Sequence, residues 1–473
     1  MKKIIIALAA VAAAFGASAQ TNWLHIYEQG NHVTSNPLED ITSIKHRQQA
    51  GSDTTFTAVQ VTTVDGKTEN VGIASIDSIV MGTNIPTMYI DIAGGAEVVE
   101  KDRYLNAVIS VKGWEGYPDF EATDVTIKGR GNSTWNMDKK PYRLKFSKKQ
   151  TLCGMTKAKN YALIANHIDC TLMRNVMALK LGQMLGLEYT NHFVPVNLVM
   201  NGTYRGQYLL TEKIGINGAS VDIDENTGIL FELDTNYDEP YKFHSNKFGV
   251  PVMVKDPDFD ELVEADPSLT QSQLLDKWRN EFHALENTLN SGGAPSADFV
   301  NQMDVSTLAK YILVFAVSRN EEPNHPKSVY LYKEEAGVPF KMGPIWDFDW
   351  AFTFNGSEGT GAYNSYLISG YSVGSQFFKA MLRSPEVMEL YAQEWANFRD
   401  NIWPELHAFM DDYAAKIRVS ALQNGEIWYT GRPDSKYSLL GTDQFDENYA
   451  TLIEWLTNRI NWLDSAQNYG LYR

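Results

Sequence analysis

Cysteine is scarce in this 473-residue sequence, which contains only Cys153 and Cys170. Two cysteines exclude a fold held together by several disulfides, and they leave open either one bridge or two buried free thiols. The nine histidines are scattered, without an HExxH motif or a His/Cys cluster, so nothing supports a zinc site. Basic residues are also fewer than acidic ones, and the net charge of −17 argues against nucleic acid as a partner.

Long apolar runs are missing after the first twenty residues. Met1-Lys2-Lys3 leads into an apolar stretch and then Ala17-Ser18-Ala19, which is the pattern of a secretory signal peptide cleaved after Ala19. The site lacks the cysteine that a lipid anchor requires, and no later run approaches the roughly 20 apolar residues of a membrane-spanning helix. The sequence therefore predicts an exported protein without a transmembrane segment, secreted or held in a bacterial periplasm or cell envelope.

The length suits two or three domains. Residues 20–83 predict a small β-rich module, with a hairpin turning at Asp65-Gly66. From about residue 86 short β segments dominate, and they are interrupted by one helix at 171–185 that follows Asp169.

A second hairpin is predicted where Asn201-Gly202 separates two apolar runs, because this dipeptide supplies the positive φ angles of a type I′ turn. After about residue 260 the pattern becomes helical, apart from a β-hairpin in "KSVYLYKEEAGVPFKMGPIWDFD". A β-rich first part and a helical second part predict an α+β fold.

The first candidate site is the turn "GRGNST", Gly129 to Thr134. Its glycines let backbone N–H groups face an anion, although an ordinary tight turn is the alternative. In the following strand, "PYRLKF", the period of two places the apolar side chains on one face and Arg143 and Lys145 on the other. These two cations could grip a phosphate chain, or they could simply form a solvated outer face.

The second candidate is "GPIWDFDWAF", which places Asp347 and Asp349 two residues apart among aromatic side chains. Carboxylates are rarely buried without a partner or a metal ion. On a strand these two would share a face and form a site of hard oxygen ligands suited to Mg²⁺ or Mn²⁺. The alternative is a structural pairing with Arg or Lys.

The third candidate is the loop "NEEPNHPKS", residues 320–328, between an apolar helix and a strand. Its two prolines suit a fixed constellation of reactive groups as well as a plain connector. The side chains available there are Glu321, Glu322, Asn324, His325, Lys327 and Ser328. A glycine turn, a basic strand, a helix, this loop and "DFD" follow one another as the corresponding elements do in protein kinases.

Together with "YALIANHIDCTLMRN", "NLVMNGTYRGQYLLTEKI" and the terminal "WLTNRINWLD", these stretches resemble the spore coat protein H (CotH) kinase family over roughly residues 86–470. The β-rich module before residue 83 lies outside the resemblance. The family implies an atypical protein-kinase-like fold with two lobes, at about 86–235 and 260–473. It also implies that ATP and Mg²⁺ or Mn²⁺ are used to phosphorylate hydroxyl groups of proteins, notably serine.

The resemblance also implies roles for individual residues. The turn would cover the phosphates, and the residues involved are Gly129, Arg130, Gly131, Asn132, Ser133 and Thr134. Lys145 would contact the phosphates, with Arg143 and Lys140 as alternatives, and Glu212 to Ile214 would line the adenine pocket. Asp347 would bind the metal with help from Asp349, and Glu322 would be the catalytic base.

The chain departs from the family pattern at the catalytic loop, where Glu321-Glu322 stand in place of the usual Asp. Lys327 stands where such loops place a second metal-binding Asn, and helix 171–185 contains no Glu to pair with the strand lysine. A carboxylate misplaced by about 1 Å can cost about 100-fold in rate. Two alternatives therefore stay open: a weak or inactive nucleotide-binding or surface-assembly protein, or a glycan-binding or glycan-active envelope protein. The protein acceptor is not identified by the sequence.

Overall fold

The computed structural model describes residues 84–114, 116–352, 362–429 and 445–473, and most of the strands that precede them, namely 23–28, 31–37, 41–48, 56–63, 66–72 and 76–82. The predicted signal peptide lies outside the described residues. Among the helices of the described ranges, none combines the length and the apolar character needed to cross a bilayer.

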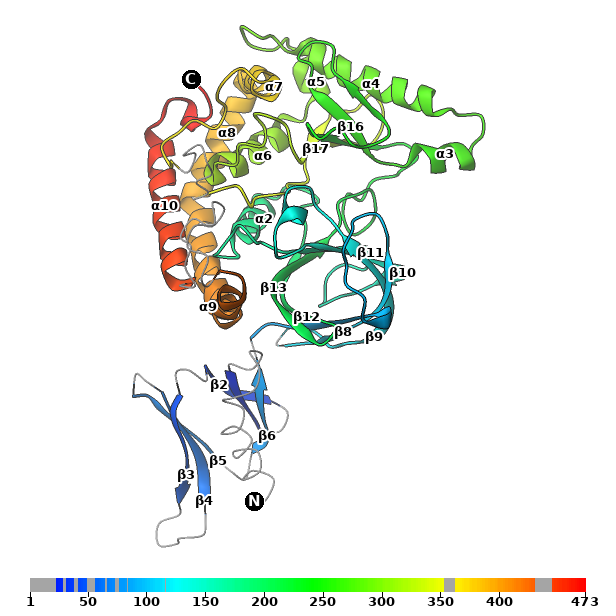
Figure 1. Cartoon of the computed structure of the whole chain (residues 1–473). Coiled ribbons are helices and arrows are strands. Elements are labelled where there is room, and N and C mark those ends of the chain that lie inside the picture. The colour runs from blue at the N-terminus through cyan, green and yellow to red at the C-terminus, as the bar shows by residue number, and fades with distance from the viewer. Residues whose placement is uncertain are drawn as a thin grey trace.

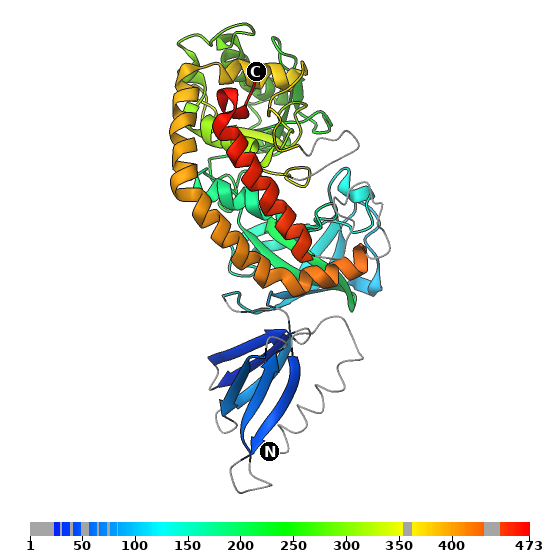
Figure 2. The same cartoon turned by 90° about the vertical axis from the view of Figure 1, so that its left-hand side faces the viewer.

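The strands before residue 83 form two small sheets that lie apart from the rest of the chain (Figures 1 and 2). β1 (Trp23–Glu28) pairs with β2 (Asn31–Pro37) and β6 (Ile76–Gly82). β4 (Phe56–Thr63) pairs with β3 (Ile41–Gln48) and β5 (Thr68–Gly72), which confirms the predicted pairing of the two strands; Asp65 of the predicted turn lies outside the described residues.

Seven strands then close into a barrel (Figure 1) in the order β10-β11-β13-β12-β7-β8-β9. They are β7 (Thr87–Ile92), β8 (Leu105–Lys112), β9 (Phe120–Gly129), β10 (Tyr142–Gln150), β11 (Ala158–Ile164), β12 (Phe193–Met200) and β13 (Thr203–Glu212). The predicted alternation along β10 is confirmed, since its apolar side chains are buried in the barrel core while Lys145 is exposed. The hairpin of β12 and β13 is also confirmed, with φ angles of 50° at Asn201 and 73° at Gly202.

A five-stranded antiparallel sheet forms a second body beside the barrel. Its strands, in spatial order, are β15 (Lys242–His244), β16 (Pro251–Asp256), β14 (Ile229–Leu233), β17 (Val329–Lys333) and β18 (Lys341–Met342). Three helices follow β16 in the chain and lie in the same part of the molecule (Figure 1): α3 (Phe259–Ala265), α4 (Gln271–Thr288) and α5 (Phe299–Gln302).

The helical part is organised around α6 (Val305–Ser318), whose sequence is almost entirely apolar and buried. The Asp304 side chain caps its start by accepting from the Thr307 N–H at 2.9 Å, and the left-handed Arg319 ends it. Packed around it are α2 (Arg174–Met184), α8 (Pro385–Asn397) and α10 (Phe445–Ser465). The predicted α+β class is confirmed, and the loop that follows α6 starts from a rigid buried helix.

The remaining helices are α7 (Val373–Leu382) and α9 (Trp403–Trp428), and α9 runs along both the helical part and the barrel (Figure 2). One prediction needs correction. The helix predicted at 171–185 begins at Arg174, because the Asp169 carboxylate first caps a short turn by accepting from the N–H groups of Thr171 and Arg174, at 3.0 and 2.8 Å. Cys153 and Cys170 are both buried free thiols, which is the second of the two alternatives above.

Candidate active site

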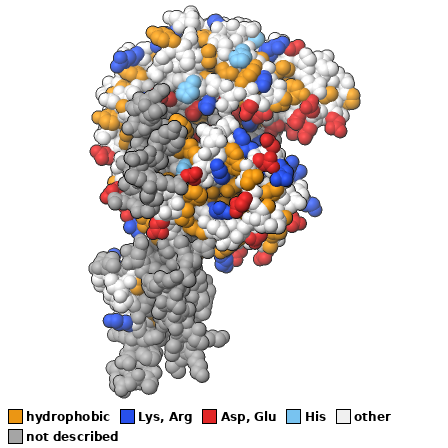
Figure 3. Space-filling model, in the orientation of Figure 1, with side chains coloured by type: hydrophobic (Ala, Val, Ile, Leu, Met, Phe, Trp, Pro, Cys, Tyr) orange, Lys and Arg blue, Asp and Glu red, His pale blue; other side chains and the backbone are white. Residues whose placement is uncertain are grey.

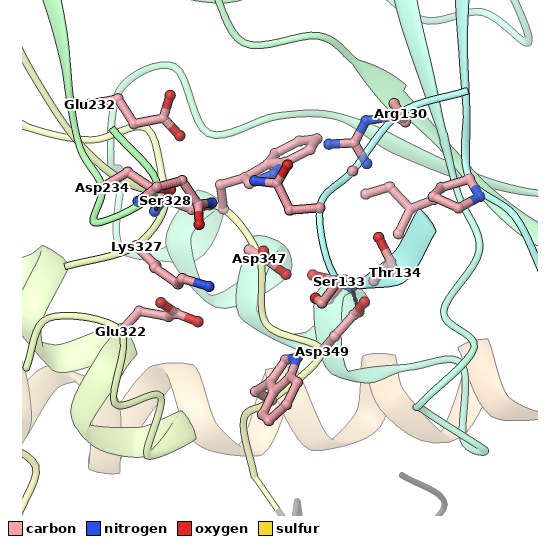
Figure 4. Close-up of a pocket in the computed structure, with 18 of the residues that line it drawn as sticks. Arg130, Ser133, Thr134, Glu232, Asp234, Glu322, Lys327, Ser328, Asp347 and Asp349 are labelled. Atoms are coloured by element: carbon pink, nitrogen blue, oxygen red, sulfur yellow. Dashed lines mark hydrogen bonds between the residues drawn. The ribbon is translucent and has the colours of Figure 1, made fainter. Parts of the chain in front are cut away.

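A cavity of about 420 Å³ lies between the barrel and the two bodies beside it, and Figure 4 shows its lining. It brings together the three segments that the sequence singled out, although they are separated by some two hundred residues. The predicted site residues that line it are Arg130, Gly131, Asn132, Ser133, Thr134, Glu322, Asp347 and Asp349. In Figure 4 Glu322 and Lys327 reach in from one side, and the glycine turn lies on the other side of Asp347.

The turn that lines the cavity depends on a glycine at position 131. Gly131 has a φ of 85°, and a Cβ atom there would lie 2.4 Å from the Thr134 hydroxyl oxygen. Among the described residues, no acceptor pairs with the backbone N–H groups of Gly131, Asn132 and Ser133. Adjacent unpaired N–H groups in a tight turn form a cradle for an anion.

The "DFD" segment is not a strand, so the prediction that its two acids share a strand face is wrong. Residues 343–348 are irregular after β18, and Asp347 adopts a left-handed φ of 63°. The start of α2 imposes this shape. Asn175 accepts from the Phe348 N–H at 2.9 Å and donates to the Asp349 carboxylate, while Arg174 donates to the Asp349 carbonyl at 2.8 Å.

The two acids of this segment are consequently different. Asp349 is 3% exposed and already holds the Asn175 amide. Asp347 is partly exposed to the cavity, and within the described ranges its carboxylate accepts no hydrogen bond and makes no ion pair. Asp347 therefore has its carboxylate oxygens free for a bound cation, whereas one oxygen of Asp349 is already engaged.

The loop after α6 is fixed to the same segment. The Asn320 side chain donates to the Asp347 carbonyl at 2.9 Å and accepts from the Glu322 N–H at 3.0 Å. The Glu322 Oε2 atom is buried and has no hydrogen-bond partner. A buried oxygen atom without a partner is costly unless something else satisfies it.

The other candidates of this loop divide into two groups. His325, Lys327 and Ser328 line the cavity. Glu321 instead pairs with Arg319 at 2.9 Å, and the buried Asn324 donates to the Leu367 carbonyl at 2.8 Å, so both have structural partners outside the cavity.

The electrostatics of the cavity reflect crowded, buried carboxylates. Burial raises the pKa of Glu322 well above its usual range, and the nearby charge of Asp347 adds to this, while Lys327 opposes it. Burial also raises the pKa of Asp347, against the influence of Arg130 and Lys327. Burial, helped by the charge of Asp347, raises the pKa of Asp349 to about 7. A cation placed among these groups would relieve their repulsion.

The acids fit a metal ion that is bound jointly with phosphate, rather than one enclosed by protein ligands. Within the described ranges, no three His, Cys, Asp or Glu side chains are grouped closely enough to hold a metal by themselves. Mg²⁺ in phosphoryl-transfer sites is commonly bound by one or two carboxylates together with substrate phosphates and water. Asp347 and Asp349 supply that number of carboxylates.

A second cavity of about 300 Å³ adjoins the first on the outer face of the barrel. Gly129, Arg143 and Ile214, which the resemblance assigns to the nucleotide site, line it. Lys145 lines neither cavity: it lies two residues further along β10 than Arg143 and its side chain is exposed. The position expected for Lys145 is therefore filled by Arg143.

Glu212, like Lys145, does not lie where the resemblance implied. Its carboxylate is 1% exposed, lines neither cavity and accepts from the His192 backbone N–H at 3.0 Å. It also lies 2.9 Å from the His192 ring Nδ1 atom, and this hydrogen bond raises the pKa of His192. Glu212 therefore holds β12 and β13 together beside the cavity rather than contacting a ligand.

Sequence reasoning missed several acids at the end of β14. Glu232 and Asp234 line the main cavity, and Lys255 of β16 pairs with Glu232 at 2.7 Å. Burial raises the pKa of Asp234 to about 6, although it accepts from the N–H groups of Asn236 and Ser328. The available signal was the pair of acids at the end of the apolar run "GILFELD".

Fold and site together define an α+β protein in which a turn with unpaired backbone N–H groups lines the same cavity as two carboxylates, the partly exposed Asp347 and the buried Asp349. The family model described as CotH kinase protein matches residues 127–463, so the chain belongs to the CotH kinase family and the resemblance is confirmed. A comparison with curated proteins found no match.

Proposed function

We propose that this protein is an atypical protein kinase that transfers the γ-phosphoryl group of ATP to a hydroxyl group, Ser or Thr, of a protein acceptor. Membership of the CotH kinase family supports a kinase-like activity. The observation that carries the proposal is that one cavity is lined by the Gly131 turn, Glu322 and Asp347. In this proposal the barrel acts as the N-lobe and the helical body as the C-lobe of a two-lobed, kinase-like fold.

Different residues of the cavity would have different roles in phosphoryl transfer. The N–H groups of Gly131, Asn132 and Ser133 would hold phosphate oxygens, and Asp347 and Asp349 would hold Mg²⁺ or Mn²⁺. The bound ion would neutralise charge that develops on the transferred phosphoryl group. Arg130, whose guanidinium group lies over the Trp346 ring at 5.3 Å, faces the same region.

Glu322 would accept the proton of the acceptor hydroxyl as its oxygen bonds to the γ-phosphorus atom and the bond to the ADP oxygen breaks. A protonated Glu322 cannot do this, and its raised pKa favours the protonated form when the site holds only its own side chains. Neutralisation of Asp347 in the loaded site would lower the pKa of Glu322, because the Asp347 charge is one of the causes of the shift.

The signal sequence supports action outside the cytoplasm, in the periplasm or at the cell surface, on an acceptor protein there. The raised pKa of Glu322 gives one alternative a specific basis, namely a protein that binds the nucleotide without transferring phosphate.

The test uses the mature chain, residues 20–473, with γ-labelled ATP, Mg²⁺ or Mn²⁺, and casein. Label should appear on casein or on the protein itself, and it should be lost in Asp347→Asn, which keeps the side-chain shape. Asp412→Asn, on the exposed face of α9, is the matched control and should keep the activity. Stabilisation by nucleotide without any label would support the non-catalytic alternative instead.

A further inference from the structure

The second cavity is strongly cationic although the protein as a whole is acidic. Its lining contains one acid, Asp102, and six basic residues: Lys101, Lys128, Arg130, Arg143, Lys213 and Lys255. The whole chain has 58 acidic residues and 41 Lys or Arg residues. In Figure 3 basic side chains gather on the barrel and acidic ones on the facing edge of the upper body, on either side of an indentation.

Most of these cations lack a counterion. Lys255 is paired with Glu232 and Glu239, at 2.7 and 2.8 Å. Within the described part of the chain, the other five basic residues make no ion pair with a carboxylate, and Lys101 donates to the Gly131 carbonyl at 2.9 Å instead. Five cations held close together, with Asp102 as the one acid of the lining, repel one another unless an anion joins them.

The lining also has an apolar part. Ala162, Ile214 and Trp346 are its aliphatic and indole members, with Tyr330 beside them. Pockets for neutral ring systems are lined mainly by apolar and aromatic side chains, with few charged groups. This cavity instead carries seven charged side chains, six of them basic, so a phosphate group suits it better than a purine base.

The two cavities have opposite charge and share a wall. The main cavity is lined by seven acids: Glu232, Asp234, Asp238, Glu239, Glu322, Asp347 and Asp349. Arg130, Gly131 and Asn132 line both cavities, so the backbone anion cradle lies where they meet. A chain of phosphates crossing this wall would place its inner groups among the cations and its terminal group beside Asp347.

We propose that the cationic cavity is a polyphosphate-binding site, which holds the phosphate chain of the donor so that donors are selected by chain length and charge rather than by their base. This rests on the proposed function for the identity of the donor. The adenine pocket expected beside Ile214 is replaced, in this proposal, by a phosphate pocket at the same place.

The experiment measures binding to the mature chain by calorimetry and by thermal shift, with no transfer reaction involved. Inorganic tripolyphosphate with Mg²⁺ should bind within about tenfold of ATP, GTP should bind within about threefold of ATP, and adenosine should not bind. Lys128→Gln combined with Lys213→Gln should weaken tripolyphosphate binding at least tenfold. Lys148→Gln with Lys149→Gln, on the exposed end of β10 and outside both cavities, is the matched control and should bind normally.

The outcomes separate this inference from the proposed function. Binding of adenosine, or ATP binding that tripolyphosphate cannot displace, overturns the polyphosphate site even if the protein transfers phosphate. An equal loss of tripolyphosphate affinity in the control variant also overturns it, because the loss would then reflect the overall charge of the protein rather than this cavity. Displaceable tripolyphosphate binding that requires Lys128 and Lys213 supports the site, including in a protein that labels no acceptor.

Discussion

The side-chain amide of Asn320 donates a hydrogen bond of 2.9 Å to the backbone carbonyl of Asp347. The same side chain accepts from the Glu322 N–H. One buried side chain thus fixes the position of the proposed base relative to the proposed metal ligand. Among the described residues no ion pair joins the two side chains, and Asn320 links their backbone groups through neutral hydrogen bonds.

Replacing Asn320 by Ala should lower kcat for phosphate transfer about 10- to 100-fold, since small displacements of reacting groups have effects of this size. Asn324→Ala is the matched control, because it removes another buried asparagine of the same loop that does not contact Asp347. Both variants should lose about 2 kcal/mol of unfolding free energy. A similar kcat in both, measured below their melting temperatures, would contradict the positioning role of Asn320.

Glu322→Gln should reduce transfer by about 10² to 10⁴-fold, which is the usual contribution of general-base catalysis. Gln keeps the shape of the side chain and removes only the proton acceptor. The thermal stabilisation of the protein by ATP and Mg²⁺ should therefore persist. Glu322→Asp should retain part of the activity, since it keeps a base on a side chain shorter by one methylene. Full activity in Glu322→Gln would remove Glu322 from the mechanism.

Arg143 and Lys145 provide a comparison within one strand. Both lie on the same face of β10, but only Arg143 lines a cavity, where it donates to the Asn160 side chain at 3.0 Å. Arg143→Gln should weaken ATP binding about tenfold, the size of one charge-assisted hydrogen bond. Lys145→Gln should leave the dissociation constant of ATP, measured by calorimetry, unchanged. Weaker binding in Lys145→Gln but not in Arg143→Gln would restore the role that the resemblance implied for Lys145.

Lys213 should make phosphate binding depend on pH. Burial, with Arg143 and Lys255 nearby, lowers the pKa of Lys213 to about 8, while Asp256 and Glu239 oppose the shift. Lys213 is therefore charged below that pH and becomes neutral above it, so tripolyphosphate binding should weaken by up to about tenfold between about pH 7 and pH 9.

Lys213→Arg is the control for this pH dependence, because arginine stays charged throughout the range while the ligand ionises identically. The fall in affinity should be absent or much smaller in this variant. Parallel curves for the wild type and Lys213→Arg would show that Lys213 does not titrate against the ligand.

Local elements could be predicted because their signals lie within a few residues. The Asn201-Gly202 hairpin depends on a dipeptide, and the alternation of β10 follows from the period of a strand. Both are confirmed. Family motifs were equally local, and they identified the three segments that line the main cavity.

Two failures at the site have a different origin, since they depend on distant contacts. Asp347 and Asp349 look like strand residues, but Asn175 and Arg174 of α2 hold them in an irregular segment. Likewise, sequence spacing alone could not tell whether Arg143 or Lys145 faces the second cavity. The residues that line this cavity together with Arg143 come from distant parts of the chain, among them Lys213 and Lys255.

The most direct test is a crystal structure of the mature chain with Mn²⁺ and a non-hydrolysable ATP analogue, using the anomalous signal of manganese. We expect manganese bound by Asp347 and Asp349, and phosphate oxygens on the N–H groups of Gly131 to Ser133. Manganese and phosphates located away from Asp347 and Gly131 would contradict the proposed site.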